Sequence, residues 1–412
     1  MTTAQQTQRP TSAELDAADP LALQREAFYT PDAGQLTSYL DGNSLGRPLK
    51  ATSANLPKFV EEAWGSRLIR GWDEMWMDEP TRVGDRIGEV TLGAAPGQVT
   101  VGDSTSVMLY KLIRAAVDAR PGRDEIIIDR DNFPTDRFII EGIAAERGAT
   151  IKWIAANPAS GVRGTDLDGL LGERTAVVVL SHVAYRSGFL ADAKAITAKV
   201  HQAGALMLWD LCHSVGSVPL ELDEWNVDLA VGCTYKYLNG GPGSPAFAYV
   251  NKARQEELQQ PIWGWMGADN PFGMTAAYAP AQGIRRFITG TPPVLAMQPL
   301  KDMVELIASV GMEAVRTKSI KLTDYAISLA EELLVPHGVE IVTPRNPAER
   351  GSHITVDHPH FADVTARLWE RGVIPDFRPP HGLRIGLSPL STSFAEVELG
   401  ITAIRDVLLE LQ

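Results

Sequence analysis

Short apolar segments alternate with amphipathic segments along residues 98–250. The apolar segments predict β-strands at 98–103, 125–130, 150–156, 175–183, 205–210, 227–233 and 244–250. Three segments between them carry apolar residues at three- and four-residue steps, which predicts helices at 104–119, 135–148 and 191–204. Strands that are apolar along nearly their whole length are buried on both faces. The alternation therefore predicts an α/β fold with a mostly parallel central sheet flanked by helices.

The pattern changes near residue 300. A long amphipathic stretch predicts a helix at about 312–336, and shorter elements follow it: strands at 339–344, 352–358 and 382–390, and helices at 362–372 and 394–410. We therefore expect an N-terminal arm at 1–35, a large α/β domain at 36–300 and a smaller C-terminal α+β domain at 301–412. Residues 1 to about 20 are polar, so we expect them to be disordered or loosely attached.

Charge and composition narrow the function classes. The net charge of −13 and the pI of about 5.2 argue against nucleic acid or an anionic membrane as a partner. The polar N-terminus predicts no signal peptide, and no run of 18 apolar residues predicts a membrane span. The two cysteines form no CxxC pair, and no two histidines have metal-ligand spacing. We expect a cytoplasmic protein without a metal site.

One lysine stands in an unusual setting. Lys236 lies between two tyrosines in GCTYKYLNGGPG, residues 232–243, just after an apolar strand. Most lysines are simply solvated, so Lys236 indicates a functional site only if other candidate residues lie near it. Asp210 ends the strand 205–210, where a carboxylate either caps a turn or holds a ligand cation, and His213 follows. Ligands of open α/β sheets bind beyond the carboxyl ends of the strands.

Other strand ends add candidate ligands. Ser104 and Thr105 open a helix, where they either cap it or form an anion site. Phe133 follows another strand and either packs in the core or stacks on a flat cofactor, while Ser181 could bind a ring substituent. No GxxxxGK[ST] or GxGxxG motif supports ATP or a dinucleotide. The combined set fits pyridoxal phosphate (PLP), which needs a lysine for a Schiff base, an acid at the pyridine nitrogen and a helix N-terminus for the phosphate.

Seven motifs carry a resemblance to a known family. They are YLDGNSLGRP (39–48), DNFPTDRF (131–138), LSHVAYRSGFLAD (180–192), LWDLCHSVGSVPL (208–220), TYKYLNGGPGSPAF (234–247), WGWMG (263–267) and RFITGTPPV (286–294). In order and spacing they closely resemble the kynureninase family, PLP enzymes of the fold-type I aminotransferase superfamily. The resemblance covers roughly residues 36–412 and looks like the bacterial type.

The resemblance implies a role for each matching cofactor position. Lys236 would bind PLP covalently and move the Cα proton, Asp210 would pair with the pyridine nitrogen, and His213 would lie beside the ring. Phe133 would stack on the ring, and Ser181 would lie near its hydroxyl. The remaining cofactor-lining positions are Ser104, Thr105, Asp136 and Tyr235, several of them around the phosphate, with Trp265 and Thr291 reaching it from the neighbouring subunit.

The resemblance also implies the substrate contacts. Arg384, in LRIGLSPL, matches the arginine that clamps the substrate α-carboxylate, and Asn43 and Ser44 lie in a motif near the substrate. Trp72 and Thr291 stand where the animal enzymes have a histidine and an asparagine. In the family those positions bear on the choice between kynurenine and 3-hydroxykynurenine, so we expect kynurenine to be the better substrate.

The implied activity is the hydrolytic cleavage of the Cβ–Cγ bond of L-kynurenine to anthranilate and L-alanine, a step of tryptophan degradation. The implied assembly is a homodimer with shared active sites. Tyr235 is the candidate acid/base for the late steps because it is next to Lys236, although a phosphate contact alone would also explain it.

Three other interpretations compete. A cysteine desulfurase commonly needs a reactive cysteine on a mobile loop, whereas Cys212 and Cys233 flank predicted strands. A class V aminotransferase is the second, and a non-catalytic PLP-fold binding protein, which would be expected to lose the lysine or the aspartate, is the third. Five further histidines are expected to be structural or solvated, namely His201, His353, His358, His360 and His381.

Overall fold

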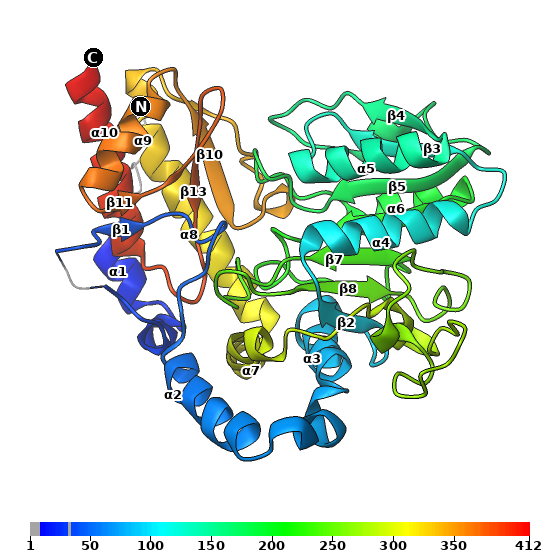
Figure 1. The fold of residues 1–412 in the computed structure, drawn as a ribbon. Helices are drawn as coiled ribbons and strands as arrows, with labels where there is room; N and C mark the ends of the chain where they lie inside the picture. The colour runs from blue at the N-terminus through cyan, green and yellow to red at the C-terminus, as the bar shows by residue number, and fades with distance from the viewer. Residues whose placement is uncertain (1–8, 32–33) are drawn as a thin grey trace.

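The computed structural model describes residues 9–31 and 34–412. Figure 1 shows a large unit around one sheet and a smaller unit that carries the C-terminus beside it. The strands of the large sheet are β2 (Val99–Gly102), β3 (Glu125–Asp129), β4 (Thr150–Ile154), β5 (Thr175–Ser181), β6 (Leu206–Asp210), β7 (Leu229–Gly232) and β8 (Ala246–Val250). Each coincides with a strand predicted above, and the predicted fold class is confirmed.

The topology of this sheet brings most strand ends to one edge. The order is β2-β8-β7-β6-β5-β3-β4. β8 is antiparallel to both of its neighbours, and the other pairs are parallel. Because β2 and β7 are both antiparallel to β8, they run in the same direction. The carboxyl ends of every strand except β8 therefore lie at the same edge.

Helices cover both faces of the sheet, as its apolar strands require. Val177 and Val179 of β5 belong to the core under α4 (Thr105–Asp118) and α5 (Pro134–Arg147). Val178 and Leu180 belong to the core on the opposite face. The helices of that face are α3 (Glu79–Ile87), α6 (Ala193–Gln202) and α7 (Gln298–Val310). No helix of the described residues is long and apolar enough to cross a membrane.

The small unit has its own core. Its sheet has the order β12-β13-β10-β9 and is antiparallel throughout. The strands are β9 (Glu340–Ile341), β10 (His353–Asp357), β12 (Asp376–Arg378) and β13 (Gly382–Gly386), and the helices are α8 (Met312–Leu333), α9 (Phe361–Glu370) and α10 (Phe394–Leu411). β1 (Ser38–Tyr39) pairs with β11 (Val373–Ile374), so the segment after residue 36 joins this unit. The domain boundaries at 35 and 300 stay predictions.

The N-terminal segment differs from expectation. Residues 12–17 form α1 (Ser12–Ala17), which begins with a capping box between Thr11 and Glu14. The carboxylate of Asp16 accepts hydrogen bonds from the backbone N–H groups of Phe394 and Ala395, both at 3.0 Å, at the start of α10. The expectation of disorder is therefore wrong for residues 9–20, and residues 1–8 lie outside the described residues. Apolar periodicity could not find this contact because a helix terminus holds the segment through a carboxylate.

A separate segment links the two units at one side. α2 (Lys50–Lys58) continues through wide helical turns at Phe59–Gly65 and Trp72–Trp76 into α3, and Figure 1 shows it as an arc below both units.

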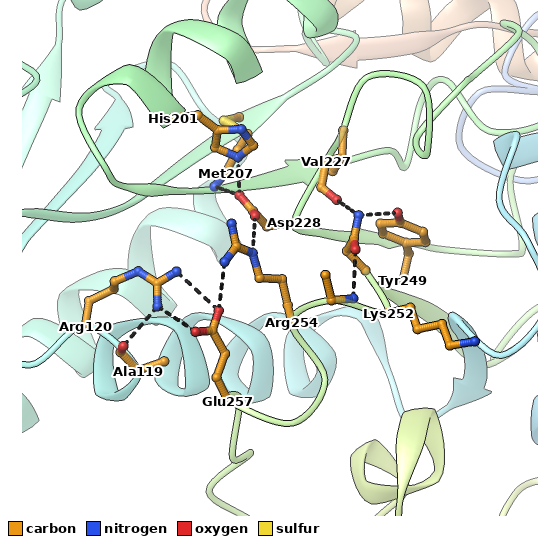
Figure 2. A network of polar contacts seen from close by, with 12 residues as sticks. Ala119, Arg120, His201, Met207, Val227, Asp228, Tyr249, Lys252, Arg254 and Glu257 are labelled. Carbon is orange, nitrogen blue, oxygen red and sulfur yellow. Dashed lines mark hydrogen bonds and ion pairs between the residues drawn. The ribbon is translucent and has the colours of Figure 1, made fainter.

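The edge of the sheet opposite the strand ends is held by Asp228, just before β7. Its carboxylate, 2% exposed, accepts from the Met207 N–H at 2.8 Å and contacts His201 at 2.7 Å and Arg254 at 2.8 Å (Figure 2).

Candidate active site

The carboxyl ends of five strands deliver candidate residues to one edge of the sheet. Ser181 is the last residue of β5 and Asp210 the last of β6, and the two are register partners. Lys236 follows β7 in a turn, Phe133 follows β3, and Ser104 follows β2. This placement comes from the topology because parallel strands end together.

Two sets of hydrogen bonds form the centre of the site, one around Asp210 and one between His213 and Lys236. The Ser181 hydroxyl lies 3.2 Å from Asp210 Oδ2, and Asp210 Oδ1 accepts from the Cys212 N–H at 2.8 Å. His213 is 4% exposed, and its Nε2 lies 3.2 Å from Lys236 Nζ. Burial, followed by the charges of Lys236 and the arginines of the small unit, holds the pKa of His213 well below its ordinary value. A neutral imidazole can accept a hydrogen bond from the lysine.

Asn132 organises the aromatic side of the site and was not singled out from the sequence. Its side-chain oxygen accepts from the Phe133 N–H at 2.7 Å and lies 3.1 Å from the Ser181 hydroxyl oxygen. Its amide nitrogen donates to Asp129 at 2.9 Å. Phe133 is the N-cap residue of α5, and its ring meets Tyr185 edge-on at 5.5 Å. An Asn before the predicted ring-stacking residue was the available signal, since Asx side chains often fix such turns.

Buried carboxyl groups gather near Lys236. Asp136 lies in the first turn of α5, is 2% exposed, and its Oδ2 has no hydrogen-bond partner among the described residues. Burial raises the pKa of Asp136 well above its ordinary value, and the nearby carboxylates of Asp210 and Asp129 raise it further, while Lys236 opposes them. A bound cation or hydrogen-bond donor would relieve this arrangement.

Tyr235 and the two cysteines lie beside the lysine. Burial raises the pKa of Tyr235 above its ordinary value, and Cys233 and Cys212 add to this, so the phenol keeps its proton. Cys212 and Cys233 are both buried, and the Cys233 N–H donates to Cys212 Sγ at 3.2 Å. Burial opposes ionisation of Cys233, but Cys212 and Lys236 outweigh it and lower the pKa to about 7. Neither thiol stands on an exposed loop.

Arg384 is held from three directions. It is 1% exposed on β13, and its Nε donates to Asp376 Oδ2 at 2.6 Å. Its Nη1 donates to the Tyr185 carbonyl at 2.8 Å and its Nη2 to the Ser44 hydroxyl at 3.0 Å. Asp376, on β12, also pairs with Arg378 at 2.8 Å. The guanidinium is thus fixed where the large unit, the small unit and the segment 39–48 meet, a suitable geometry for binding a carboxylate.

The segment 39–48 reaches this place through two close backbone approaches. The Gly46 N–H donates to the Tyr235 carbonyl at 2.8 Å, and a Cβ on Gly46 would lie 2.4 Å from the Lys236 carbonyl oxygen. Asn43 is 0% exposed, and neither polar atom of its side chain has a partner among the described residues. A Cβ on Gly386 would lie 1.9 Å from Asn43 Oδ1. Glycine is required at both positions because any side chain would displace the segment.

Ser104 and Thr105 occupy the predicted helix start. Ser104 is the N-cap residue of α4, where its hydroxyl accepts from the Val107 N–H at 3.5 Å, and Thr105 is the first helical residue. The preceding Asp103 turns away and pairs with Lys111 at 2.9 Å. The N-terminus of α4 therefore remains a candidate anion site at the same sheet edge as Lys236.

Three predicted residues lie apart from this group within one chain. Trp72 is half-buried in the arc after α2 and meets Trp76 edge-on at 5.4 Å. Trp265 is 44% exposed and contacts Phe272, and Thr291 is exposed. No contact of these three with the Lys236 group is recorded among the described residues. The roles predicted for all of the site residues stay predictions.

The residues at the sheet edge fit PLP. Asp210 is bound by two neutral donors, so a protonated ring nitrogen would supply its missing cation. Lys236 has His213 as its recorded side-chain partner and no ion pair with a carboxylate among the described residues, which leaves its amine available for an aldehyde. No cluster of three or more His, Cys, Asp or Glu side chains in the described chain could hold a metal ion.

Comparisons with known proteins give the family context. The family model described as the kynureninase C-terminal domain matches residues 315–404. A kynureninase of Burkholderia pseudomallei (strain 1106a) is 43% identical over 401 residues, covering 96% of this chain and 94% of the relative. A kynureninase of Pseudomonas fluorescens is 40% identical over the same length and coverage.

Solved structures support the fold. The cysteine desulfurase CsdA of Escherichia coli superimposes with a TM-score of 0.80 at 17% identity, over 95% of this chain and 98% of that chain. A C-DES variant with glycine covalently linked to its PLP cofactor superimposes with a TM-score of 0.79 at 18% identity, over 92% and 100%. At these identities the likeness concerns the fold alone.

Proposed function

The chain belongs to the kynureninase family, and from this premise we propose that it hydrolyses the Cβ–Cγ bond of L-kynurenine to anthranilate and L-alanine. The observation that carries the proposal is the convergence of Lys236, His213, Asp210 and Ser181 at the edge of the sheet, with Arg384 fixed across from them. Family membership over nearly the whole chain favours this activity over a cysteine desulfurase. The buried positions of Cys212 and Cys233 support the same choice.

The cofactor is PLP, which when bound withdraws electrons from the bonds at the substrate's Cα. Lys236 would hold it, Asp210 would face its ring nitrogen, and Phe133 and His213 would lie against its ring. Asp136 and the N-terminus of α4, with Ser104 and Thr105, would contribute further polar contacts. Two observations on the described residues agree with these roles: Asp136 Oδ2 has no hydrogen-bond partner, and the Asp210 carboxylate accepts from the neutral Ser181 hydroxyl.

Three side chains of the protein would bind the substrate and transfer protons. Arg384 binds the α-carboxylate, and its contacts with Asp376, Tyr185 and Ser44 keep the guanidinium from turning. The Lys236 amine would take the proton from the substrate's Cα, with His213 Nε2 within hydrogen-bonding distance of it at 3.2 Å. The raised pKa of Tyr235 means that the phenol carries its proton, and its position next to Lys236 makes it the candidate acid for the β-carbon after Cβ–Cγ cleavage.

Substrate choice depends on residues at the edge of this group. Asn43 has two unpaired polar atoms and would satisfy them on the substrate, with Ser44 beside it. We propose that Trp72 and Thr291 favour kynurenine over 3-hydroxykynurenine. Both substrates offered in parallel test this, and a higher kcat/KM for 3-hydroxykynurenine contradicts it.

We propose a homodimer in which each site is completed by Trp265 and Thr291 of the other subunit. Support comes from large apolar side chains that are exposed in one chain: Trp64 at 50%, Ile69 at 77%, Trp263 at 63%, Trp265 at 44% and Met274 at 82%. Analytical ultracentrifugation should give twice the chain mass of 44.7 kDa. A monomer at micromolar concentration that is fully active would remove this proposal. A cytoplasmic location stays a prediction.

The test of the activity uses the purified protein with added PLP. L-kynurenine should yield anthranilate, detected by fluorescence, and L-alanine, detected by mass spectrometry, in equal amounts. Incubation with L-cysteine in a parallel reaction tests for desulfuration. Release of sulfide with no anthranilate would replace the proposal with the desulfurase.

A further inference from the structure

His353 occupies an unexpected position between the two units. It is the first residue of β10, is 0% exposed, and neither ring nitrogen has a hydrogen-bond partner among the described residues. Its ring centroid lies 5.6 Å from that of His213, at an interplanar angle of 54°. His213 in turn lies 3.2 Å from Lys236. His353 of the small unit is therefore connected to Lys236 by way of the His213 ring.

The loop 185–188 encloses His353 from the other side. The Gly351 N–H donates to the Gly188 carbonyl at 2.8 Å, and the Thr355 hydroxyl donates to the Arg186 carbonyl. A Cβ on Gly188 would lie 2.7 Å from the His353 carbonyl oxygen, so the loop and β10 are in close contact. The same loop carries the Tyr185 carbonyl that holds Arg384. His353 is thus fixed in place by its surroundings, although its ring nitrogens have no well-aligned hydrogen bond among the described residues.

The groups facing both imidazoles keep them neutral. Burial lowers the pKa of His353 well below its ordinary value, Arg384 and Lys236 lower it further, and the backbone of Tyr185 and Arg186 opposes this only in part. His213 is lowered by burial and then by Lys236, Arg384, His353 and Arg378. The largest charge effects on both histidines come from cationic side chains, Lys236 and Arg384.

Packing alone does not account for an imidazole here. An apolar ring of similar size would fill the space without burying two ring nitrogens whose closest polar neighbours, the backbone of Tyr185 and Arg186, are not well aligned with them, and poorly paired buried polar groups have a cost in stability. Where polar groups are buried without partners, a role in binding or orientation is the first alternative.

We propose that His353 is a positioning residue: it holds the ring of His213 so that Nε2 points at the Lys236 amine. The proposal rests on the proposed function, because it gives His353 a role only through the lysine that binds the cofactor. In His353→Ala, the space beside His213 opens. The imidazole gains freedom to rotate, water reaches it, and Lys236 loses the fixed acceptor at 3.2 Å.

The experiment has two readouts in the cofactor-free protein. The first is the rate at which it captures added PLP, followed by absorbance. The second is the titration of His213 by NMR with carbon-labelled histidine, its signal being identified by its absence in a His213→Gln sample. His182→Ala is the matched control. His182 is also a buried imidazole, 3% exposed with an unpartnered Nδ1, but it packs against Trp209 and Trp225 instead of His213.

We expect His353→Ala to slow PLP capture by about tenfold or more, equivalent to about 1.4 kcal/mol of lost positioning. We also expect the pKa of His213 to rise toward its ordinary value as water enters. His353→Gln, which fills more of the space, should lie between His353→Ala and the wild type and serves if the alanine variant does not fold. His182→Ala should capture PLP at the wild-type rate and leave the titration of His213 unchanged.

Two results separate the possible failures. If both His353 variants capture PLP as fast as the wild type and His213 still does not titrate, His353 only fills space and the inference is wrong. If the wild-type protein itself captures no PLP at Lys236, the proposed function fails instead. Equal slowing in His182→Ala and His353→Ala would also overturn the inference, because it would show a general loss of packing.

Discussion

Replacing Arg384 by lysine tests the proposed carboxylate clamp. The variant keeps the positive charge but loses the planar fork that contacts Asp376, the Tyr185 carbonyl and Ser44. A hydrogen bond to a charged group contributes about 1.5–3 kcal/mol, so the loss of one bond to the substrate carboxylate predicts a fall in kcat/KM of about 10- to 150-fold. Most of the fall should appear in KM, because the carboxylate is bound before and during the reaction.

The assay can assign this loss to the carboxylate itself. Anthranilate formation is measured for the wild type and Arg384→Lys with L-kynurenine and with its analogue lacking the α-carboxylate. Removing the α-carboxylate from the substrate should lower the activity of the wild type. It should lower the activity of Arg384→Lys much less, since the variant already lacks the guanidinium that binds this carboxylate.

A nearby variant supplies the control. Arg378→Lys alters the other arginine that contacts Asp376, but this side chain is 33% exposed, so we expect a change below about threefold. If Arg384→Lys leaves KM unchanged, or discriminates between the two compounds as strongly as the wild type, the clamp is assigned to the wrong residue.

Three further predictions concern single residues. Tyr235→Phe should lower kcat by about a hundredfold while PLP remains bound by absorbance titration, because the acid for the β-carbon is lost; an unchanged kcat would leave Tyr235 with a phosphate contact only. Asp228→Ala should lower the melting temperature by about 3 °C in calorimetry, from about 3 kcal/mol lost when His201 and Arg254 lose a buried partner, with kcat unchanged; a loss of kcat without a change in melting temperature would contradict this. Burial raises the pKa of Asp41 to about 6, above its unfolded value, so its contribution to stability is present at low pH and is lost as pH rises from about 4 through 6. Asp41→Asn should therefore gain stability relative to the wild type over that window, measured by denaturant titration, and a constant difference across it would show that Asp41 is not buried as described.

The large sheet was predictable because its strands are apolar along nearly their whole length, which indicates burial on both faces. The runs at 175–181 and 206–210 are apolar on both faces, and residues of β5 alternate between two cores. Once these strands were recognised, Asp210 and Ser181 had to meet at one edge because parallel strands end together. The family motifs then supplied the residues that topology alone leaves open.

Contacts between distant segments were not predictable. Asp376 orients Arg384 from a neighbouring strand, and Asn132 lies close to Ser181, 49 residues along the chain, but neither relation has a local pattern in the sequence. His353 was expected to be structural or solvated, since a single histidine in a strand carries no signal of its neighbours. α1 was missed because its attachment depends on Asp16 and the start of α10, not on apolar spacing.

The most direct measurement is the product balance from L-kynurenine. Purified protein with PLP should form anthranilate and L-alanine in a one-to-one ratio, and Lys236→Ala under the same conditions should form neither. A wild-type protein that binds PLP but makes no anthranilate, or a Lys236→Ala variant with near-normal turnover, would contradict the assignment of this site to the hydrolysis of kynurenine.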